Sequence, residues 1–258
     1  MAERMTGEMP FLDHLEELRW RLVRSFAALG IGMAVGFFVV YHFHLIAVLA
    51  RPIAPYLHGH KLVYTHPADT FSTELSVAFV FGAILALPVI GYQVWAFLSP
   101  ALYKHEKRIV LPVLGAAVLL FACGVALAYF FVMPISLQFL LGLESQAMEP
   151  MITASDYFGF MTTLALAFGG TFEMPLVVVA LTAIGVVTPM FLTKYRRHAI
   201  VLCWLVAAVV TPGDFLGTTL ALAIPLYLLF ELSVVLSKIV YRRKERRHAE
   251  LIGEEAAT

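Results

Sequence analysis

Long apolar runs with almost no charged residues dominate this sequence, and they decide its fold class. Six can be delimited, at residues 25–41, 75–98, 109–131, 157–187, 199–210 and 215–237. They leave 14% of the 258 residues charged, whereas a soluble domain usually carries about 25%. Inside a bilayer each backbone N–H and C=O must find its partner within the segment, which favours helices. We therefore predict an all-α, polytopic membrane protein formed by a single membrane domain over residues 1–258.

The lengths of the runs predict six transmembrane helices between about residues 25 and 237. A spanning helix needs roughly 20 residues to cross about 30 Å of hydrocarbon, and four of the runs exceed that length. The run at 25–41 nearly reaches it. The run at 199–210 covers only about 18 Å, so either it extends into its flanks or the bilayer thins around it. We prefer two short spans here to a re-entrant hairpin, because residues 211–214 have the composition of a tight turn.

The distribution of basic residues predicts the orientation. Sixteen of the 18 Lys and Arg residues lie before the first run, between the second and third, between the fourth and fifth, and after the sixth. Only Arg51 and Lys61 lie in the loop at residues 42–74. By the positive-inside rule both termini are cytoplasmic, which predicts a multi-pass protein of the inner membrane. The charged residues 241–258 are expected to form a mobile cytoplasmic tail.

Four prolines lie inside the apolar runs, namely Pro88, Pro112, Pro175 and Pro225. Proline removes a backbone donor and bends helices, so bent helices could build a concave, cup-shaped bundle. Proline is also simply common in membrane helices. Both interpretations stay open from the sequence alone.

An amphipathic helix is predicted at the N-terminus, within residues 1–22. Apolar residues at positions 11, 12, 15, 18 and 22 share one helical face, so this helix should lie on the cytoplasmic membrane surface. Asp13, Glu17 and Arg21 follow at i, i+4 spacing. Either Glu17 pairs with Arg21 for about 0.2–0.5 kcal/mol, or it accepts a better cation.

Two further carboxylates stand out. Glu106 lies among Lys104, Lys107 and Arg108; spacing alone favours simple charge compensation over a role as an acceptor on the same membrane face as Glu17. Glu173 lies inside the fourth run, where a carboxyl costs about 2.5 kcal/mol or more and is a functional hypothesis by default. Its alternative role is to satisfy carbonyls freed by Pro175.

Enzyme signatures are absent from the sequence. It contains no HExxH pair, no GxSxG elbow and no GxxxxGK[ST] loop. Cys123 and Cys203 have neither disulfide-framework nor zinc spacing. We expect no enzymatic activity, no cofactor, no metal and no nucleic-acid partner, so any work must use an existing gradient or a partner's energy.

Four stretches of the chain carry a more specific signature. They are HLEELRWRL from His14, YQVWAFLSPALYKHEKR from Tyr92, FGGTFEMP from Phe168 and VVTPGDFLGTTLALAIPLYLLFE from Val209. In this order and spacing they resemble the TatC family of the twin-arginine protein translocase. The resemblance implies a cup-shaped bundle of six helices, short in its last two, that helps export folded proteins at the expense of the proton motive force.

The resemblance also implies a receptor for signal peptides with two consecutive arginines. It assigns their recognition to Glu17 and Glu106, which reverses the preference that spacing gave for Glu106. Guanidinium groups favour bidentate carboxylate partners that lysine cannot reproduce. Phe97 matches an aromatic residue that packs near the signal. The remaining residues expected at this site are His14, Leu15, Leu18 and Arg19.

Single-helix subunits of the TatA and TatB type are the other partners that the resemblance implies, together with lipid and further copies of the chain. Glu173 matches the family's intramembrane acidic residue. The outer-turn positions implied in the same contacts are Thr211, Pro212, Asp214 and Thr218. Gly213, Gly217 and Ser76 depart from the family's usual residues, and these departures concern partner contacts rather than the signal-binding carboxylates.

An ion-coupled carrier and an intramembrane hydrolase are the two alternative functions. An ion-coupled carrier of small solutes could use Glu173, but a carrier usually has two related halves, and residues 1–130 and 131–258 show no such pairing. An intramembrane hydrolase would need a nucleophile with a nearby base, and none is evident.

Overall fold

The computed structural model describes residues 11–57, 59–98, 110–142, 151–210 and 217–255, and nearly all of them are helical. Its helices are α1 (Phe11–His42), α2 (Leu45–Leu49), η1 (Arg51–Tyr56), α3 (Asp69–Leu98), α4 (Val110–Leu127), η4 (Ala128–Val132), α5 (Met133–Gly142), α6 (Ala154–Phe172), α7 (Met174–Ile184), α8 (Pro189–Lys194), α9 (Arg196–Val210) and α10 (Gly217–Glu255). Within the described ranges the one β contact is an isolated bridge between Val63 and Thr153. The predicted all-α fold is confirmed.

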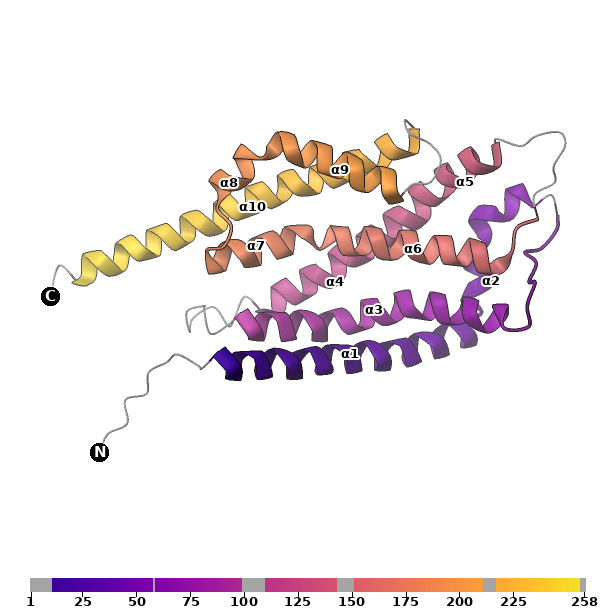
Figure 1. Cartoon of the computed structure of the whole chain (residues 1–258), viewed down its shortest axis with the longest axis horizontal. Helices are drawn as coiled ribbons and strands as arrows, with labels where there is room; N and C mark the ends of the chain where they lie inside the picture. The colour runs from indigo at the N-terminus through magenta and orange to yellow at the C-terminus, as the bar shows by residue number, and fades with distance from the viewer. Residues whose placement is uncertain (1–10, 58, 99–109, 143–150, 211–216, 256–258) are drawn as a thin grey trace.

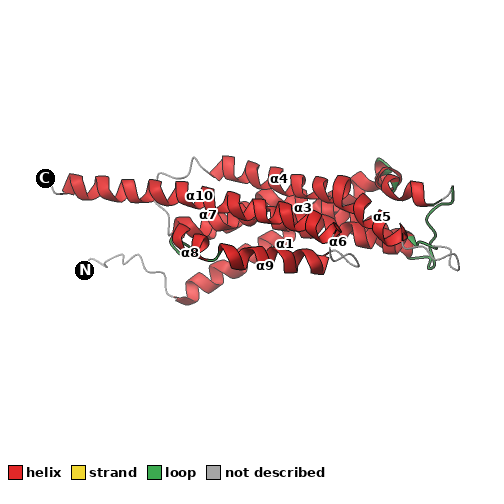
Figure 2. Ribbon diagram, turned by 90° about the horizontal axis from the view of Figure 1, so that it is seen from above, coloured by secondary structure: helices red, strands yellow, loops and turns green. Residues whose placement is uncertain are grey.

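The long helices run back and forth along one axis (Figures 1 and 2). The start of α1 and the end of α10 lie at the same end, which we call the proximal end. α2 lies at the opposite, distal end. The order of the elements thus agrees with a chain whose two termini share one side, although no membrane side is assigned by it.

Five helical segments are long and apolar enough to cross a membrane. They are Leu15–His42, Asp69–Phe97, Pro112–Gly142, Ala154–Ile184 and Leu222–Arg242. At most 33% of the most apolar part of each segment is buried within the protein, so lipid must cover the rest. α9 has 15 residues and reaches about 22 Å. It is longer than predicted but still short, and a sixth span and a cup shape stay predictions.

α1 and α10 are both longer than the spans predicted from the sequence. No break separates the predicted amphipathic helix at residues 11–22 from the first span, because α1 is one helix of 32 residues. α10 likewise continues to Glu255, through most of the charged region at residues 241–258 where a mobile tail is predicted. Runs of good helix formers such as Arg, Lys, Glu and Ala explain the continuation.

A π-helical turn, η4, continues the third span beyond its predicted end at residue 131. The N–H of Met133 bonds to the carbonyl of Ala128, five residues back. Pro134 follows directly. It has no N–H to donate, and its ring clashes with the carbonyl four residues earlier in a regular α-helix. The bulge absorbs this conflict, so the helix runs on through α5 instead of ending.

The fourth span is divided at Glu173, which ends α6 and precedes α7. Pro175 lies in the first turn of α7, where its missing N–H costs nothing. Pro112 similarly lies in the first turn of α4. Pro88 and Pro225 lie inside α3 and α10 without interrupting them. Pro175 therefore marks a helix start rather than an internal kink.

Glycines allow the closest helix contacts. A Cβ atom on Gly32 would lie 2.6 Å from the Gly82 carbonyl oxygen, and one on Gly36 would lie 2.6 Å from the Ala78 oxygen. These contacts join α1 to α3, its main neighbour. Gly124 brings α4 equally close to the Phe168 carbonyl of α6. Small residues at such crossings are typical of membrane helices.

Two hydrophobic clusters complete the packing. The larger one includes Val40, Ile53, Phe158 and Leu222 and joins α1, η1, α6 and α10. The smaller one, with Leu192, Phe230 and Val234, joins α8 to α10. Between α7 and α10, a buried hydrogen bond of 2.8 Å links the hydroxyls of Thr182 and Ser237.

Candidate functional site

A polar cavity of about 430 Å³ lies on the first turns of α1, at the proximal end. Its lining residues are Glu17, Trp20, Arg21 and Arg24. Their spacing of three and four residues places them on one helical face. Trp20 is 56% exposed, and Glu17 is half-buried. The face therefore presents a carboxylate, two guanidinium groups and an aromatic ring together.

Glu17 already holds a guanidinium group. Arg21 Nε donates to Glu17 Oε1 at 3.0 Å, and a second donor, Nη2, reaches the same oxygen. This is the i, i+4 pair that the sequence predicted. Such i, i+4 pairs contribute only about 0.3–0.5 kcal/mol where they are exposed, and this one is part-buried.

Four of the other residues expected at the signal site can be located in the structure. Leu15 and Arg19 are exposed, Leu18 is half-buried, and Phe97 is half-buried near the end of α3. α1 and α3 are antiparallel neighbours, so the start of α1 and the end of α3 share the proximal end (Figure 1). Phe97 thus lies at the same end as Glu17.

Two of the expected residues lie outside this description. Glu106 is not among the described residues, and of His14 only its place in α1 is described. Sequence reasoning also overlooked Trp20 and Arg24 as members of the face. Their i+3 and i+7 spacing from Glu17 was the available signal.

Glu173 is the second candidate site. It is half-buried at the junction of α6 and α7, and its Oε1 is buried with no hydrogen-bond partner among the described residues. The backbone carbonyl of Glu173 accepts from the N–H groups of Leu176 and Val177. The role of the Glu173 carboxyl toward the carbonyls freed by Pro175 stays a prediction.

The outer-turn residues of the partner site are not placed. Thr211, Pro212 and Asp214 lie outside the described residues, and Thr218 is described only as part of α10. α9 ends at Val210 and α10 begins at Gly217 on either side of them.

Glu231 connects side chains of α9 and α10. Its Oε2 accepts from Arg196 Nη2 at 2.7 Å, and its Oε1 accepts from the Tyr227 hydroxyl at 2.9 Å. The ion pair connects α9 to α10.

Metal binding finds no support in the described ranges, where no three His, Cys, Asp or Glu side chains come together. Cys123 is exposed and Cys203 is buried, and both are free thiols.

Comparison with known proteins gives a consistent result. The family described as Sec-independent protein translocase protein (TatC) matches residues 13–225. TatC of Desulforapulum autotrophicum is 41% identical over 93% of this chain and 88% of its own length. TatC of Escherichia coli K12 is 38% identical over 93% of this chain and 92% of its own length. A crystal structure of the twin-arginine translocase receptor TatC superposes with a TM-score of 0.72 at 38% identity, covering 88% of this chain and 99% of the other.

Proposed function

Because this chain belongs to the TatC family and is therefore a multi-pass component of the Sec-independent protein translocase, we propose that it is the signal-peptide receptor and core scaffold of that translocase. A translocase component is a transport protein, in agreement with the expected non-enzymatic function. In this proposal the chain binds the Arg-Arg motif of folded cargo proteins and recruits single-helix subunits.

The Glu17 face is the observation that carries the receptor role. A half-buried carboxylate that already pairs with a guanidinium has the chemistry to accept a signal-peptide arginine by exchange. The incoming arginine replaces Arg21 at Oε1, and Arg21 is released toward solvent. Two consecutive arginines need a second acceptor, and the resemblance assigns it to Glu106. Lysine lacks the planar fork of donors that makes such pairs geometrically specific.

The apolar part of the signal would pack beside this face. Phe97 is half-buried at the same end of the bundle, and Leu15 and Phe26 on α1 are 44% and 69% exposed. An apolar segment that follows the arginines would extend from the interface along this exposed surface into lipid.

Glu173 supports the recruitment of partner helices. Its unpartnered buried oxygen lies in a span whose surface is mostly lipid-facing. A partner helix with a hydroxyl or amide group could donate a hydrogen bond to it, and such bonds between membrane helices contribute about 0.6–2 kcal/mol.

Peptide binding to the full chain in nanodiscs tests the receptor role. An Arg-Arg signal peptide and its Lys-Lys counterpart are titrated against the wild type, Glu17→Gln and Glu106→Gln. Each change to the protein or the peptide should weaken binding about tenfold or more. Glu16→Gln is the matched control, since Glu16 is the exposed neighbour of Glu17.

Other outcomes separate the parts of the proposal. Equal binding by all combinations would contradict the receptor role, and proton-coupled solute transport through Glu173 would then be the function to test. Glu173→Gln should leave peptide affinity unchanged while lowering the amount of single-helix subunit that copurifies. Unchanged copurification would remove Glu173 from the partner site but leave the signal site intact.

A further inference from the structure

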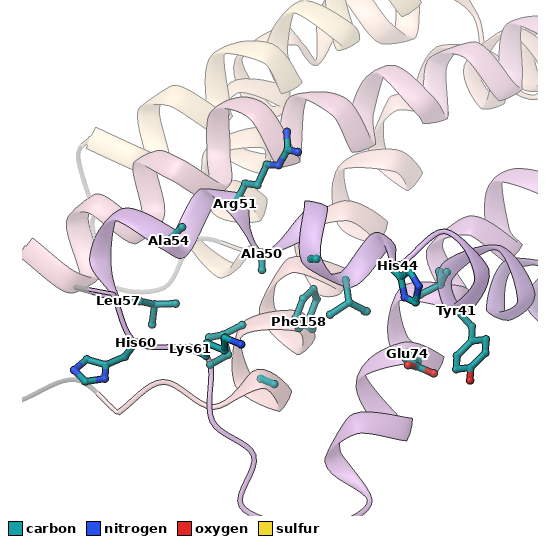
Figure 3. Close-up of a pocket in the computed structure, with 15 residues that line it drawn as sticks. Tyr41, His44, Ala50, Arg51, Ala54, Leu57, His60, Lys61, Glu74 and Phe158 are labelled. Carbon is teal, nitrogen blue, oxygen red and sulfur yellow. The ribbon is translucent and has the colours of Figure 1, made fainter.

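A second cavity, of about 600 Å³, lies at the distal end, away from the Glu17 face. It is enclosed by the end of α1, by α2 and η1, by the following loop, and by the starts of α3 and α6 (Figure 3). These are the points where three spans end or begin, at His42, Asp69 and Ala154. The cavity therefore lies at the depth of lipid headgroups rather than of acyl chains.

Charges of both signs line this cavity. Lys61 and Glu74 lie on either side of Phe158, while Arg51 points away from them (Figure 3). Lys61 is exposed and Glu74 half-buried, and neither has an ion-pair partner among the described residues. The other titratable groups of the lining are Tyr41, His44 and His60. A ligand with one anionic and one cationic group would complement Lys61 and Glu74 together.

The wall between the two charges is apolar. Val40 and Phe158 are 0% and 1% exposed and form a rigid floor. Ala47, Ala50 and Ala54 have side chains too short to fill the space above it. An apolar wall between separated charges suits an amphipathic molecule better than a free ion.

Hydrogen bonds from the spans hold the cavity in place. The Tyr129 hydroxyl donates to the Val48 carbonyl at 3.0 Å, and the Tyr157 hydroxyl donates to the Leu49 carbonyl at 2.8 Å. The bridge at Val63 ties the following loop to the start of α6. A site fixed in this way loses little conformational entropy when a ligand binds.

We propose that the distal cavity binds one phosphatidylethanolamine molecule, with its phosphate at Lys61, its ammonium at Glu74 and its glycerol region along Ala50 and Ala54. A purely anionic headgroup would satisfy Lys61 but face the carboxylate of Glu74. Phosphatidylcholine carries both charges, but its trimethylated nitrogen has no N–H to donate. The proposal does not depend on the signal-peptide site.

Native mass spectrometry of the full chain tests the proposal. The protein is released from nanodiscs that contain equal amounts of phosphatidylethanolamine, phosphatidylglycerol and phosphatidylcholine. The wild type should retain phosphatidylethanolamine preferentially. Lys61→Gln should lower the retention of phosphatidylethanolamine and phosphatidylglycerol by about fivefold each, whereas Glu74→Gln should lower only that of phosphatidylethanolamine. Lys238→Gln, which removes an exposed cation at the proximal end, should change neither.

Equal retention of the three lipids by the wild type, or wild-type retention by both cavity variants, would overturn the proposal. The identity of the occupant has a separate test in native membranes, with a photo-crosslinking residue at Ala54, which is exposed. A lipid adduct supports the proposal. Crosslinking to a second copy of the chain or to another protein would show a protein interface there instead and would also overturn it.

Discussion

At the scale of single residues, Arg21 is the side chain that a signal arginine would displace from Glu17 Oε1 under the proposed function. It occupies Oε1 of Glu17 through two donors, and Arg24 lies on the same face. The free receptor thus holds its acceptor in an ion pair, which keeps a half-buried carboxylate from being left without a cation. Exchange of one guanidinium for another conserves this pairing during binding.

Removing the internal competitor should therefore tighten binding slightly. Arg21→Gln is expected to raise the affinity for an Arg-Arg peptide by about twofold, which corresponds to the free energy of a helical i, i+4 ion pair. Isothermal titration calorimetry in nanodiscs measures this affinity. Lys238→Gln, which changes an exposed cation of α10 outside the lining of the cavity, is the control. A loss of affinity in Arg21→Gln would mean that Arg21 orients Glu17 rather than competes for it.

Glycine packing gives a second prediction at this scale. A methyl group at Gly32 would collide with the Gly82 backbone, whereas one at Gly30 would meet no atom within 4 Å. Gly32→Ala should destabilise the protein by about 1–3 kcal/mol through overpacking. Thermal unfolding in detergent should show a lower midpoint for Gly32→Ala and an unchanged midpoint for Gly30→Ala. Equal midpoints would contradict a tight α1–α3 contact.

At the scale of elements, α9 depends on α10 for support. It packs mainly on α10 and α8, and much of its surface is exposed, including Val201 at 67% and Val209 at 78%. The ion pair between Arg196 and Glu231 fixes its first turn. A short helix with one main neighbour is held by few contacts, so the loss of any one of them should weaken its attachment to α10.

Loss of this ion pair should loosen the proximal end of α9. Glu231→Gln is expected to cost about 0.2–1 kcal/mol and to speed amide exchange near residue 196, which hydrogen–deuterium exchange mass spectrometry can detect. Exchange in α4, which does not contact the pair, serves as the internal reference. Unchanged exchange in α9 would show that apolar packing alone holds it.

Element boundaries also show where sequence reasoning succeeded and where it failed. Apolar runs located every long helix, because a charge-free stretch has few alternatives in lipid. The sequence did not show that the amphipathic segment at residues 11–22 and the first span form one helix. Continuity depends on backbone hydrogen bonds, which hydropathy does not report. The π-helical turn before Pro134 was missed because a proline pattern alone does not distinguish a bulge from a break.

The candidate sites were predictable to different degrees. The Glu17–Arg21 pair followed from i, i+4 spacing, and Glu173 stood out as a carboxyl in an apolar run. The distal cavity could not be predicted, because Lys61, Glu74 and Phe158 are far apart in sequence. Only the folding of α2 and η1 against α6 brings them to one place.

At the scale of the whole molecule, the two ends of the bundle differ in charge. Described Lys and Arg residues gather at the proximal end, on α1, α8, α9 and α10, whereas Arg51 and Lys61 lie in the distal segment that lines the second cavity. The positive-inside rule assigns the proximal end to the cytoplasm. The Glu17 face and the distal cavity would then open to opposite sides of the membrane.

Thiol labelling can test this orientation. In a background of Cys123→Ala and Cys203→Ala, His60→Cys should react with an impermeant maleimide in intact cells, because positively charged segments stay inside. Glu245→Cys should react only after permeabilisation. Both positions are exposed, so accessibility within the protein does not limit either reaction. The reverse pattern would invert the assigned topology.

The unbroken course of α1 has a mechanical consequence. A single rigid rod runs from Glu17 to His42, a length of about 38 Å. It packs on α3, and Gly32 and Gly36, in its second half, allow close approach to the α3 backbone. Because no break interrupts this helix, a displacement of its first turns can be carried along it to Val40 and Tyr41, which line the distal cavity.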